Sequence, residues 1–340
     1  MSGLPPDHER YARAALAAYG RDRDTPLRLL SLSENATYLA DDGDPMVLRV
    51  HRPGYHSLEA IRSELKWMAA LREQAGVVTP ELIRARDGSA VVAATVAGNT
   101  LHVDAVTFIS GCTAEEQPDI VGFDELGRIT AAMHDHVQHW TAPDYFTRFS
   151  WDVAATLGHQ ARWGNWRHAP GLTPADEATV ERAAAEVGRR LTEFGCDTDR
   201  FGLIHADLRM ANLMVDPGNA STEPSTITVI DFDDCGWSWY LFDLAAVVSF
   251  IEDTPEAERM IADWLRGYLE VRDIAVEHLE MIPTLVMLRR LMLTAWVASH
   301  ADADAAIAFT DGYATGTARL AERYLTDRDW LRDAIHSSRV

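Results

Sequence analysis

The sequence predicts an α+β protein with two domains, a small β-rich N-terminal domain and a larger, mostly helical C-terminal one. Residues 26–53 form three strand-like runs separated by turn residues, whereas the chain beyond residue 123 has long stretches of helical periodicity. The chain has 340 residues and is 47% hydrophobic. It can therefore fill two cores, because a single core stops growing at about 250–300 residues. We place the domains at 1–105 and 112–340, joined by an apolar linker at 106–111.

The individual elements follow from local signals. The turn Asp41-Asp42-Gly43-Asp44 is typical of a β-hairpin, and Gly76 is placed to end a helix. Thr173 and Pro174 fit the N-cap and first position of another helix. The expected helices are 7–20, 57–76, 123–140, 173–195, 241–252, 255–271, 277–299 and 303–325, and the expected strands lie within 26–53, at 90–96 and at 101–108.

The charge balance excludes some classes of partner. The chain has 52 acidic and 31 basic residues and a net charge of -21. Its mean field repels phosphate, so we expect neither a nucleic-acid partner nor binding to an anionic membrane. A cationic small molecule fits this field better, although acidic residues spread over the surface for solubility would give the same composition.

The cysteines and the N-terminus indicate a soluble, cytoplasmic protein. There are three cysteines and no C-x-x-C spacing, so neither a disulfide framework nor a zinc site is predicted. The first twenty residues lack the apolar core of a signal peptide, and no apolar run reaches the roughly 18 residues of a membrane helix. The oligomeric state stays open.

The densest polar motif lies at the ends of short strand-like runs. His205, Asp207 and Asn212 have the spacing H-x-D-x-x-x-x-N, and Asp231 follows the next apolar run. Each residue alone is typical of a turn, but pairing of the flanking strands would bring the oxygen-bearing side chains together. Asn212 and Asp231 suit Mg²⁺, which takes few protein ligands and keeps water and phosphate oxygens. Asp207 then remains available to accept a proton from a hydroxyl.

With these motifs the chain resembles the aminoglycoside phosphotransferase-like family of the kinase superfamily, over roughly residues 27–325. The motifs that match are His205/Asp207/Asn212, Ile230-Asp231-Phe232-Asp233 and Asp243-Leu244-Ala245. The resemblance implies a bilobal protein-kinase-like fold, ATP or GTP bound between the lobes, and Mg²⁺. The implied acceptor is a hydroxyl of a small molecule, either an antibiotic such as an aminoglycoside or an amino alcohol or amino acid such as choline or homoserine.

The resemblance also implies roles around the catalytic loop. Asp207 would orient and deprotonate the hydroxyl. Arg209 stands where protein kinases often have a Lys facing the transferred phosphoryl group; the alternative is a loop arginine paired with nearby acids. His205 and Asp233 are expected in secondary roles, and Asp243 is expected to brace the loop by accepting hydrogen bonds.

The nucleotide phosphates of a kinase are held by a cation on the third strand, which a helix carboxylate positions. Arg49 stands where the family usually has Lys, and Glu64 is its expected partner. Arg52 is a weaker competitor of Arg49, and Glu59 and Glu73 are rivals of Glu64. No glycine-rich phosphate loop is present. The other residues expected at the nucleotide are Ser33, Asn35 and Thr37 near the phosphates and Phe108 and Ile109 near the adenine.

Two other functions stay open: a protein Ser/Thr kinase of the bacterial stress-response type and a nucleotide-binding pseudokinase. Only 12 residues lead from Asp231 to Asp243, too few for an activation loop with a peptide platform. A pseudokinase has no reason to keep Asp207, Asn212 and Asp231 together.

Histidines and tryptophans supply the last candidates. His134, His136 and His139 do not have the i, i+4 spacing of zinc ligands, and we interpret them as surface or capping residues. Tryptophans gather at 151, 163, 166, 237 and 239; most should be core, and some are expected to wall a pocket where an indole face holds a cation.

Overall fold

The computed structural model describes residues 4–32, 35–118, 120–216, 226–300, 304–309, 311–327 and 329–337. The chain divides into two compact units. The first unit comprises residues 1–113, 141–148 and 213–233, and the second comprises 114–140, 149–212 and 234–340. An antiparallel sheet in the first unit and a mostly helical second unit confirm the predicted α+β class. The domain boundaries given by the sequence stay a prediction.

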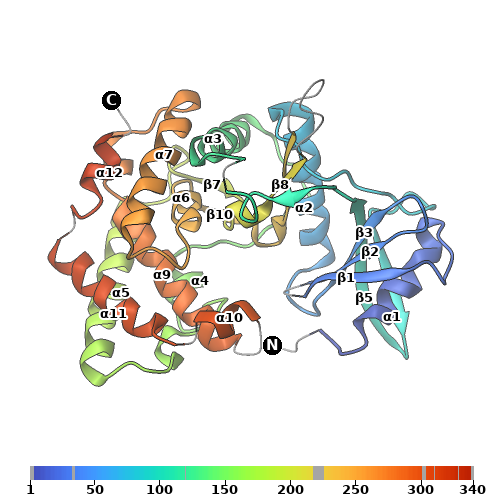
Figure 1. The fold of residues 1–340 in the computed structure, drawn as a ribbon, viewed down its shortest axis with the longest axis horizontal. Coiled ribbons are helices and arrows are strands. Elements are labelled where there is room, and N and C mark those ends of the chain that lie inside the picture. Colours follow the sequence, from blue (N-terminus) through green and yellow to red (C-terminus); the bar gives the residue numbers. More distant parts are fainter. Residues whose placement is uncertain are drawn as a thin grey trace. The chain divides into compact units, whose positions relative to one another are not determined.

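The first unit is built on a five-stranded antiparallel sheet with the strand order β1-β2-β3-β5-β4 (Figure 1). Its strands are β1 (Leu27–Leu32), β2 (Asn35–Ala40), β3 (Met46–His51), β4 (Val91–Val96) and β5 (Asn99–Thr107). The turn at Asp41–Asp44 joins β2 to β3, as predicted.

Helix α1 (His8–Ala15) covers one face of this sheet, where Leu48 and Val50 of β3 are fully buried. Because successive strand residues point to opposite faces, Arg49 and His51 lie on the other face. Helix α2 (Leu58–Ala70) begins after its N-cap Ser57 and continues as a π-helical turn, Leu71–Ala75, up to Gly76. Gly76 has a left-handed φ of 68°, which fits its predicted role as the end of the helix.

A second, three-stranded sheet in the first unit has the order β6-β8-β9. Its strands are β6 (Cys112–Thr113), β8 (Leu213–Asp216) and β9 (Thr226–Val229). Gly111 precedes β6 with a φ of 118°, and a Cβ atom there would lie 2.1 Å from the backbone oxygen of Val215. Only glycine therefore allows the chain to approach β8 this closely.

The second unit surrounds a two-stranded antiparallel ribbon of β7 (Phe201–Ile204) and β10 (Gly236–Trp239). The sequence analysis missed β10. The stretch 141–170 contains the short helix α4 and a single 3₁₀ turn. The helices are α3 (Phe123–His139), α4 (Val153–Leu157), α5 (Pro174–Phe194), α6 (Phe242–Val247), α7 (Pro255–Val271), α8 (Val276–Leu279), α9 (Ile282–Ser299), α10 (Asp304–Phe309), α11 (Tyr313–Thr326) and α12 (Arg332–Ser337).

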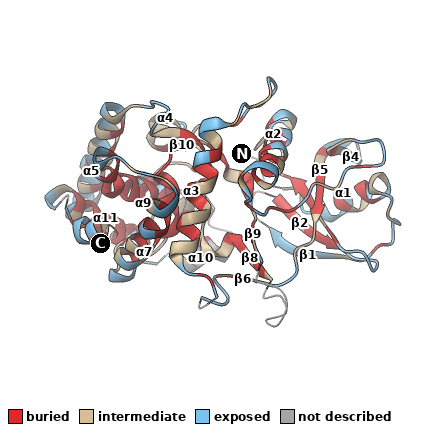
Figure 2. Cartoon of the chain, turned by 90° about the horizontal axis from the view of Figure 1, so that it is seen from above, coloured by how far each residue is buried: buried red, intermediate tan, exposed pale blue. Residues whose placement is uncertain are grey.

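Helix α9 is the core helix of the second unit and packs against α5, α6 and α11. The segment Val276–Ser299 is long and apolar enough to cross a membrane, but 89% of its most apolar window is buried inside the protein, as in a core helix (Figure 2). Helix α5 begins with the predicted cap, because the Thr173 side chain accepts from the Asp176 amide while Asp176 bonds back to the Thr173 amide.

Candidate active site

The predicted catalytic loop, residues 205–212 of the second unit, follows β7. Asn212, at the end of the 3₁₀ turn Met210–Asn212, donates its side-chain amide to the backbone oxygen of Asp207 at 2.7 Å and to Asp207 Oδ2 at 3.0 Å. These two bonds close the H-x-D-x-x-x-x-N stretch into one tight loop, as the sequence predicted. Both bonds use the side-chain nitrogen of Asn212, so its oxygen Oδ1, the atom type that can bind a metal, takes no part in them.

Two arginines contact the Asp207 carboxylate. Arg209 Nε lies 3.3 and 3.4 Å from its two oxygens, and Arg289 of α9 donates to Oδ1. Burial alone would raise the pKa of Asp207, but the Arg209 and Arg289 charges hold it below its ordinary value. Asp207 is therefore ionised at neutral pH. The pairing alternative for Arg209 is observed, and its role toward a phosphoryl group stays a prediction.

The sequence analysis missed Arg289. Its side chain is 1% exposed, and it also donates to the backbone oxygen of Ala206 at 3.1 Å and to Ser249 Oγ at 3.0 Å. The signal was present, because Arg289 and Arg290 interrupt the most apolar helix of the chain. A buried arginine needs an acidic partner, and the partner of Arg290 is the buried Glu252 at 2.7 Å.

Asp243 holds the backbone of the catalytic loop by accepting hydrogen bonds, as predicted. Its carboxylate accepts the backbone N–H groups of His205 at 3.2 Å and Ala206 at 2.7 Å. His205 in turn accepts the Asp207 N–H on its Nδ1 at 3.3 Å. The third hydrogen-bond partner of the Asp243 carboxylate is His134, whose Nε2 lies 3.0 Å from Asp243 Oδ2. The interpretation of His134 and His136 as surface residues was wrong, since both are buried.

Asp231 belongs to the first unit and is exposed. It follows β9 by one residue, at the end of the hairpin where Leu213 pairs with Val229, and Asn212 immediately precedes Leu213. Asp231 has a φ of 62°, a left-handed conformation that is costly for a residue with a side chain. An amide oxygen and a carboxylate are a donor set that fits Mg²⁺ with phosphate and water as its other ligands.

Asp233 is engaged within the first unit. Its Oδ1 accepts from the Asn35 amide at 2.9 Å and lies 3.4 Å from His56 Nε2, and its side chain is buried. Burial opposes ionisation, but His56 and Arg148 hold the pKa of Asp233 far below its ordinary value. The amide of Asn35, which we expected near the phosphates, is thus bonded to Asp233. The roles of both residues toward nucleotide and metal stay predictions.

Arg49 is paired with Glu64, as expected, and not with Glu59 or Glu73. Arg49 Nη1 lies 2.6 Å from Glu64 Oε1. The sequence analysis missed its second partner, Asp104 of β5, which Arg49 contacts through Nε and Nη2 at 2.9 Å each. Both carboxylates are fully buried.

Two further basic side chains complete this cluster. His51 Nε2 lies 2.5 Å from Asp104, and Arg148 Nη1 lies 3.6 Å from Glu64 Oε2. Although burial disfavours the charged form, Arg49 and His51 hold the pKa of Asp104 below its ordinary value. The signal for Asp104 was a carboxylate between the apolar residues Val103 and Ala105 of β5, directly opposite Arg49 in the β3–β5 ladder.

The remaining predicted nucleotide residues differ in placement. Thr37 pairs with Arg49 across β2 and β3 and therefore lies on the same sheet face. Phe108 and Ile109 are half-buried in the segment between β5 and β6. Ser33 lies outside the described residues.

Comparison with known proteins identifies relatives. Residues 26–278 match the sequence profile of the phosphotransferase enzyme family. The amicoumacin kinase of Bacillus subtilis (strain 168) is 25% identical over 300 residues, which are 84% of each chain.

Solved structures agree with the predicted fold. The structure of a microcompartment-associated aminopropanol kinase is 43% identical, with a TM-score of 0.85, over 93% of this chain and 97% of that one. The amicoumacin kinase hAmiN, solved with AMP-PNP, Ca²⁺ and Ami, is 21% identical, with a TM-score of 0.73, over 93% and 94% of the two chains. This second likeness concerns the fold alone.

The Arg49 cluster leads to a stability prediction. Arg49→Lys should lower the melting temperature, because one ammonium cannot reproduce the two-point contact with Asp104 as well as the bond to Glu64. Adding Asp104→Asn should recover part of the loss, since it removes a buried carboxylate that has lost its two-point contact with the guanidinium. A double-mutant cycle by thermal unfolding should give a coupling of about 0.5–3 kcal/mol. Strictly additive losses would contradict the pairing.

Proposed function

Because the chain belongs to the phosphotransferase enzyme family, we propose that it transfers the γ-phosphoryl group of ATP to the hydroxyl of a small amino alcohol. The observation that carries the reaction type is the ionised Asp207, fixed by Arg209, Arg289 and Asn212 in the catalytic loop. The acceptor class is supported by the 43% identity to an aminopropanol kinase over nearly the whole chain.

In this proposal Asp207 orients the acceptor hydroxyl and takes its proton. A carboxylate with a lowered pKa is a weak base, so it suits a late proton transfer. Phosphoryl transfer passes through a loose transition state in which the attacking oxygen stays close to neutral until the new bond forms. Arg289 and Arg209 hold the carboxylate in place, and Arg209 is also a candidate for offsetting charge on the transferred group.

The proposal assigns the phosphates and the metal to further residues. Arg49, positioned by Glu64 and Asp104, would contact nucleotide phosphates. Asn212 and Asp231 would hold Mg²⁺, which supplies charge neutralisation at the phosphates when it is bound.

An aromatic cluster near α9 supports a cationic acceptor. Phe250, with a left-handed φ of 72°, stacks on Phe309 at 4.2 Å, and Trp296 lies 6.4 Å from Phe250. All three are partly exposed. Trp296 follows Arg289 by seven residues, so both lie on one face of α9, about 10 Å apart along the helix axis. Aromatic faces bind ammonium groups in such positions.

The alternatives are weaker. A protein kinase needs a platform for a peptide, but β10 occupies residues 236–239 and α6 begins at Phe242, which leaves no long segment after Asp231. An antibiotic is the second candidate acceptor, because the amicoumacin kinase of Bacillus subtilis is 25% identical over 84% of the chain. An ADP-release screen with Mg²⁺ against amino alcohols, amino acids and antibiotics tests the whole proposal.

The first kinetic prediction concerns Asp207. Asp207→Asn should lower kcat by about 10²–10⁴-fold, because an amide cannot accept the proton. ATP affinity, measured by calorimetry, should change little. Asp135→Asn, an exposed acid of the same unit, is the control and should behave like wild type. Wild-type turnover in the Asp207 variant would rule out the mechanism.

The second kinetic prediction concerns Asp231. Asp231→Ala should weaken the binding of ATP in the presence of Mg²⁺ and leave binding in EDTA unchanged, because the metal links the protein to the phosphates. Asp273→Ala, an exposed acid in the second unit, serves as the control. Equal calorimetric affinities of variant and parent in Mg²⁺ would exclude Asp231 as a ligand.

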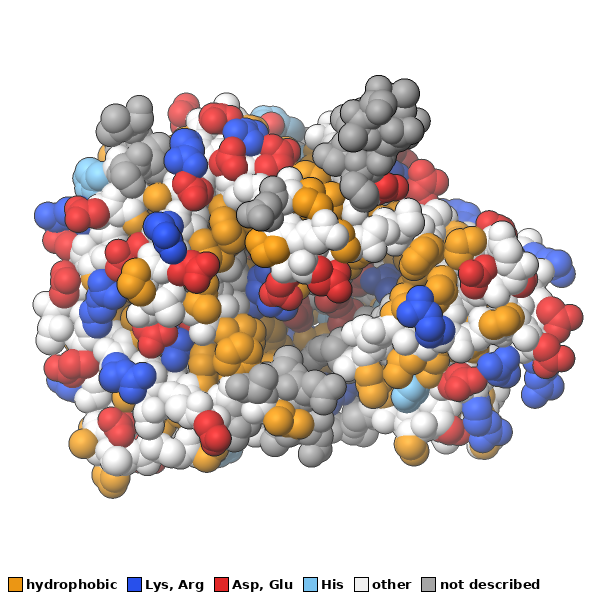
Figure 3. All heavy atoms as spheres, in the orientation of Figure 1, with side chains coloured by type: hydrophobic (Ala, Val, Ile, Leu, Met, Phe, Trp, Pro, Cys, Tyr) orange, Lys and Arg blue, Asp and Glu red, His pale blue; other side chains and the backbone are white. Residues whose placement is uncertain are grey.

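The third kinetic prediction concerns charge. Figure 3 shows acidic and basic side chains interspersed on the visible face, whereas the whole chain carries a net charge of -21. The KM of a cationic amino alcohol should rise between low and physiological ionic strength, because salt screens steering. A neutral diol of the same length is the control. A salt-independent KM for the amino alcohol would contradict electrostatic recruitment.

A further inference from the structure

A row of buried polar side chains connects a surface cavity of the second unit with the catalytic loop. It begins at Arg272, whose Nη1 lies 2.6 Å from the hydroxyl of Tyr268 on α7. That hydroxyl lies 2.9 Å from Nδ1 of His134 on α3, and His134 Nε2 lies 3.0 Å from Asp243 Oδ2. Tyr268, His134 and Asp243 are each 0% exposed. The row ends at the backbone N–H groups of His205 and Ala206, which donate hydrogen bonds to the Asp243 carboxylate.

We propose that Tyr268 and Arg272 are positioning residues for the phosphoryl transfer, acting through His134 and Asp243 on the peptide that precedes Asp207. The kinetic part of this proposal rests on the proposed function, and the structural part does not. The donor of each hydrogen bond in the row can be identified. The assignment starts from Arg272, the first residue of the row.

The direction is fixed at Arg272. A guanidinium can only donate, so the Tyr268 oxygen accepts from Arg272 and its single hydrogen is donated to His134 Nδ1. Burial lowers the pKa of His134, which is therefore neutral. A neutral imidazole that accepts on Nδ1 carries its proton on Nε2, and this proton is donated to Asp243. The structure thus assigns the Nε2–H tautomer to His134.

The far end of the row holds a strained peptide. Ala206 has a φ of 68°, a left-handed conformation that is unfavourable for a residue with a side chain. Its N–H is held by Asp243 at 2.7 Å and its carbonyl by Arg289 at 3.1 Å. The two peptide groups that flank Ala206 are therefore both held, the one before it by the row and the one after it by Arg289 of α9.

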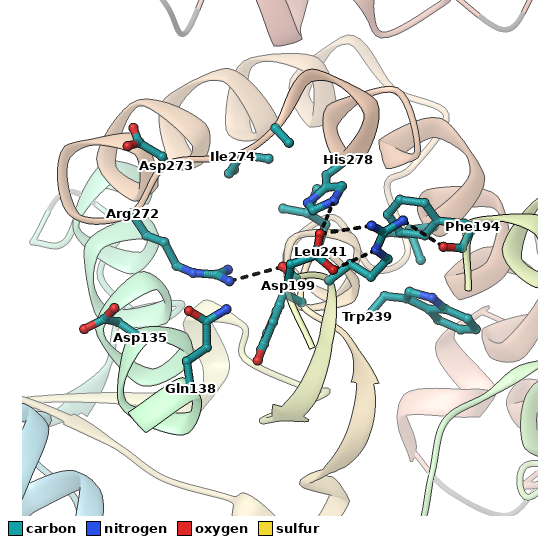
Figure 4. Close-up of a pocket in the computed structure, with 14 residues that line it drawn as sticks. Asp135, Gln138, Phe194, Asp199, Trp239, Leu241, Arg272, Asp273, Ile274 and His278 are labelled. Carbon is teal, nitrogen blue, oxygen red and sulfur yellow. Dashed lines mark hydrogen bonds and ion pairs between the residues drawn. The ribbon is translucent and has the colours of Figure 1, made fainter. Parts of the chain in front are cut away.

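The near end of the row is open to solvent. Arg272 lines a cavity of about 330 Å³. Figure 4 shows the Arg272 side chain extending toward Asp199, with Gln138 beside it. The guanidinium is held over the ring of Tyr240 at 4.4 Å, and that ring lies 4.8 Å from the His134 ring. The row thus runs from a half-buried cation through a dry interior to the loop.

Replacing Tyr268 by Phe tests the row. The variant keeps the ring but removes the donor to His134 Nδ1, so only the Nε2–H bond to Asp243 still orients the imidazole. We expect kcat to fall about 10-fold, as for the loss of outer partners of a metal-bound histidine. The KM for ATP should stay within about 2-fold, since the row does not touch the nucleotide residues.

Tyr324→Phe is the matched control. Tyr324 is also 0% exposed, and its hydroxyl bonds to the Thr284 hydroxyl at 3.2 Å, outside the row. It should keep the wild-type kcat. Arg272→Met, which removes only the first donor, should lie between wild type and Tyr268→Phe and serves if the latter does not fold.

An independent readout is the ¹⁵N spectrum of the histidine rings. Wild type should show the Nε2–H tautomer for His134, Tyr268→Phe should keep this tautomer but show a shifted Nδ1 resonance because that nitrogen has lost its hydrogen bond, and Tyr324→Phe should match wild type. An Nδ1–H tautomer in wild type overturns the proposal, and so does an equal loss of kcat in the two Tyr variants. If no acceptor is phosphorylated by wild type, the proposed function fails, and the spectrum alone decides the row.

Discussion

The ion pair between Arg289 and Asp207 links the chemistry of this protein to its core. The arginine comes from the most buried helix, and the carboxylate lies 82 residues earlier in the catalytic loop. A lone arginine in the middle of α9 would be too costly to bury, and a lone carboxylate beside it would be protonated more readily. Each charge therefore lowers the free-energy cost of burying the other. The Arg289 guanidinium also lies 5.8 Å from the ring of Phe242 in α6, so one side chain of α9 reaches both α6 and the catalytic loop.

The first unit solves the same problem with more partners. Arg49 balances Glu64 and Asp104, while His51 shares Oδ2 of Asp104 with Arg49 and Arg148 lies 3.6 Å from Glu64 Oε2. The lysine usual in the family has one charged nitrogen and would leave one of these acids poorly satisfied. The arginine at position 49 is therefore matched to a second buried acid, which is a structural reason for the departure from the family pattern.

The local signals of the sequence were sufficient for much of the fold. The hairpin turn at Asp41–Asp44, the cap at Thr173 and the end of α2 at Gly76 each depend on a few consecutive residues, and all three are present. The catalytic loop could be predicted for the same reason, because His205, Asp207 and Asn212 lie within one short segment. The Arg49–Glu64 pair required only the order of one strand and one helix.

What sequence reasoning missed depends on contacts between distant segments. Asp104 meets Arg49 through a strand register, and Arg289 reaches the catalytic loop through helix packing. Strand β10 is short and rich in tryptophan and becomes a strand by pairing with β7. His134 was misread because its partners, Tyr268 and Asp243, lie more than a hundred residues later. No local pattern encodes such partners.

The discontinuity of the first unit has a consequence for synthesis. Its five-stranded sheet is complete by residue 107, but β6 pairs with β8, which begins only at residue 213. A ribosome that adds about 5–20 residues per second needs roughly 5–20 s for the intervening hundred residues. During that interval β6 lacks its partner strand on the nascent chain. The backbone of β8 that Gly111 approaches in the finished protein has not yet been synthesised. Synonymous codons that slow translation between residues 113 and 213 would lengthen this exposure without altering the finished protein.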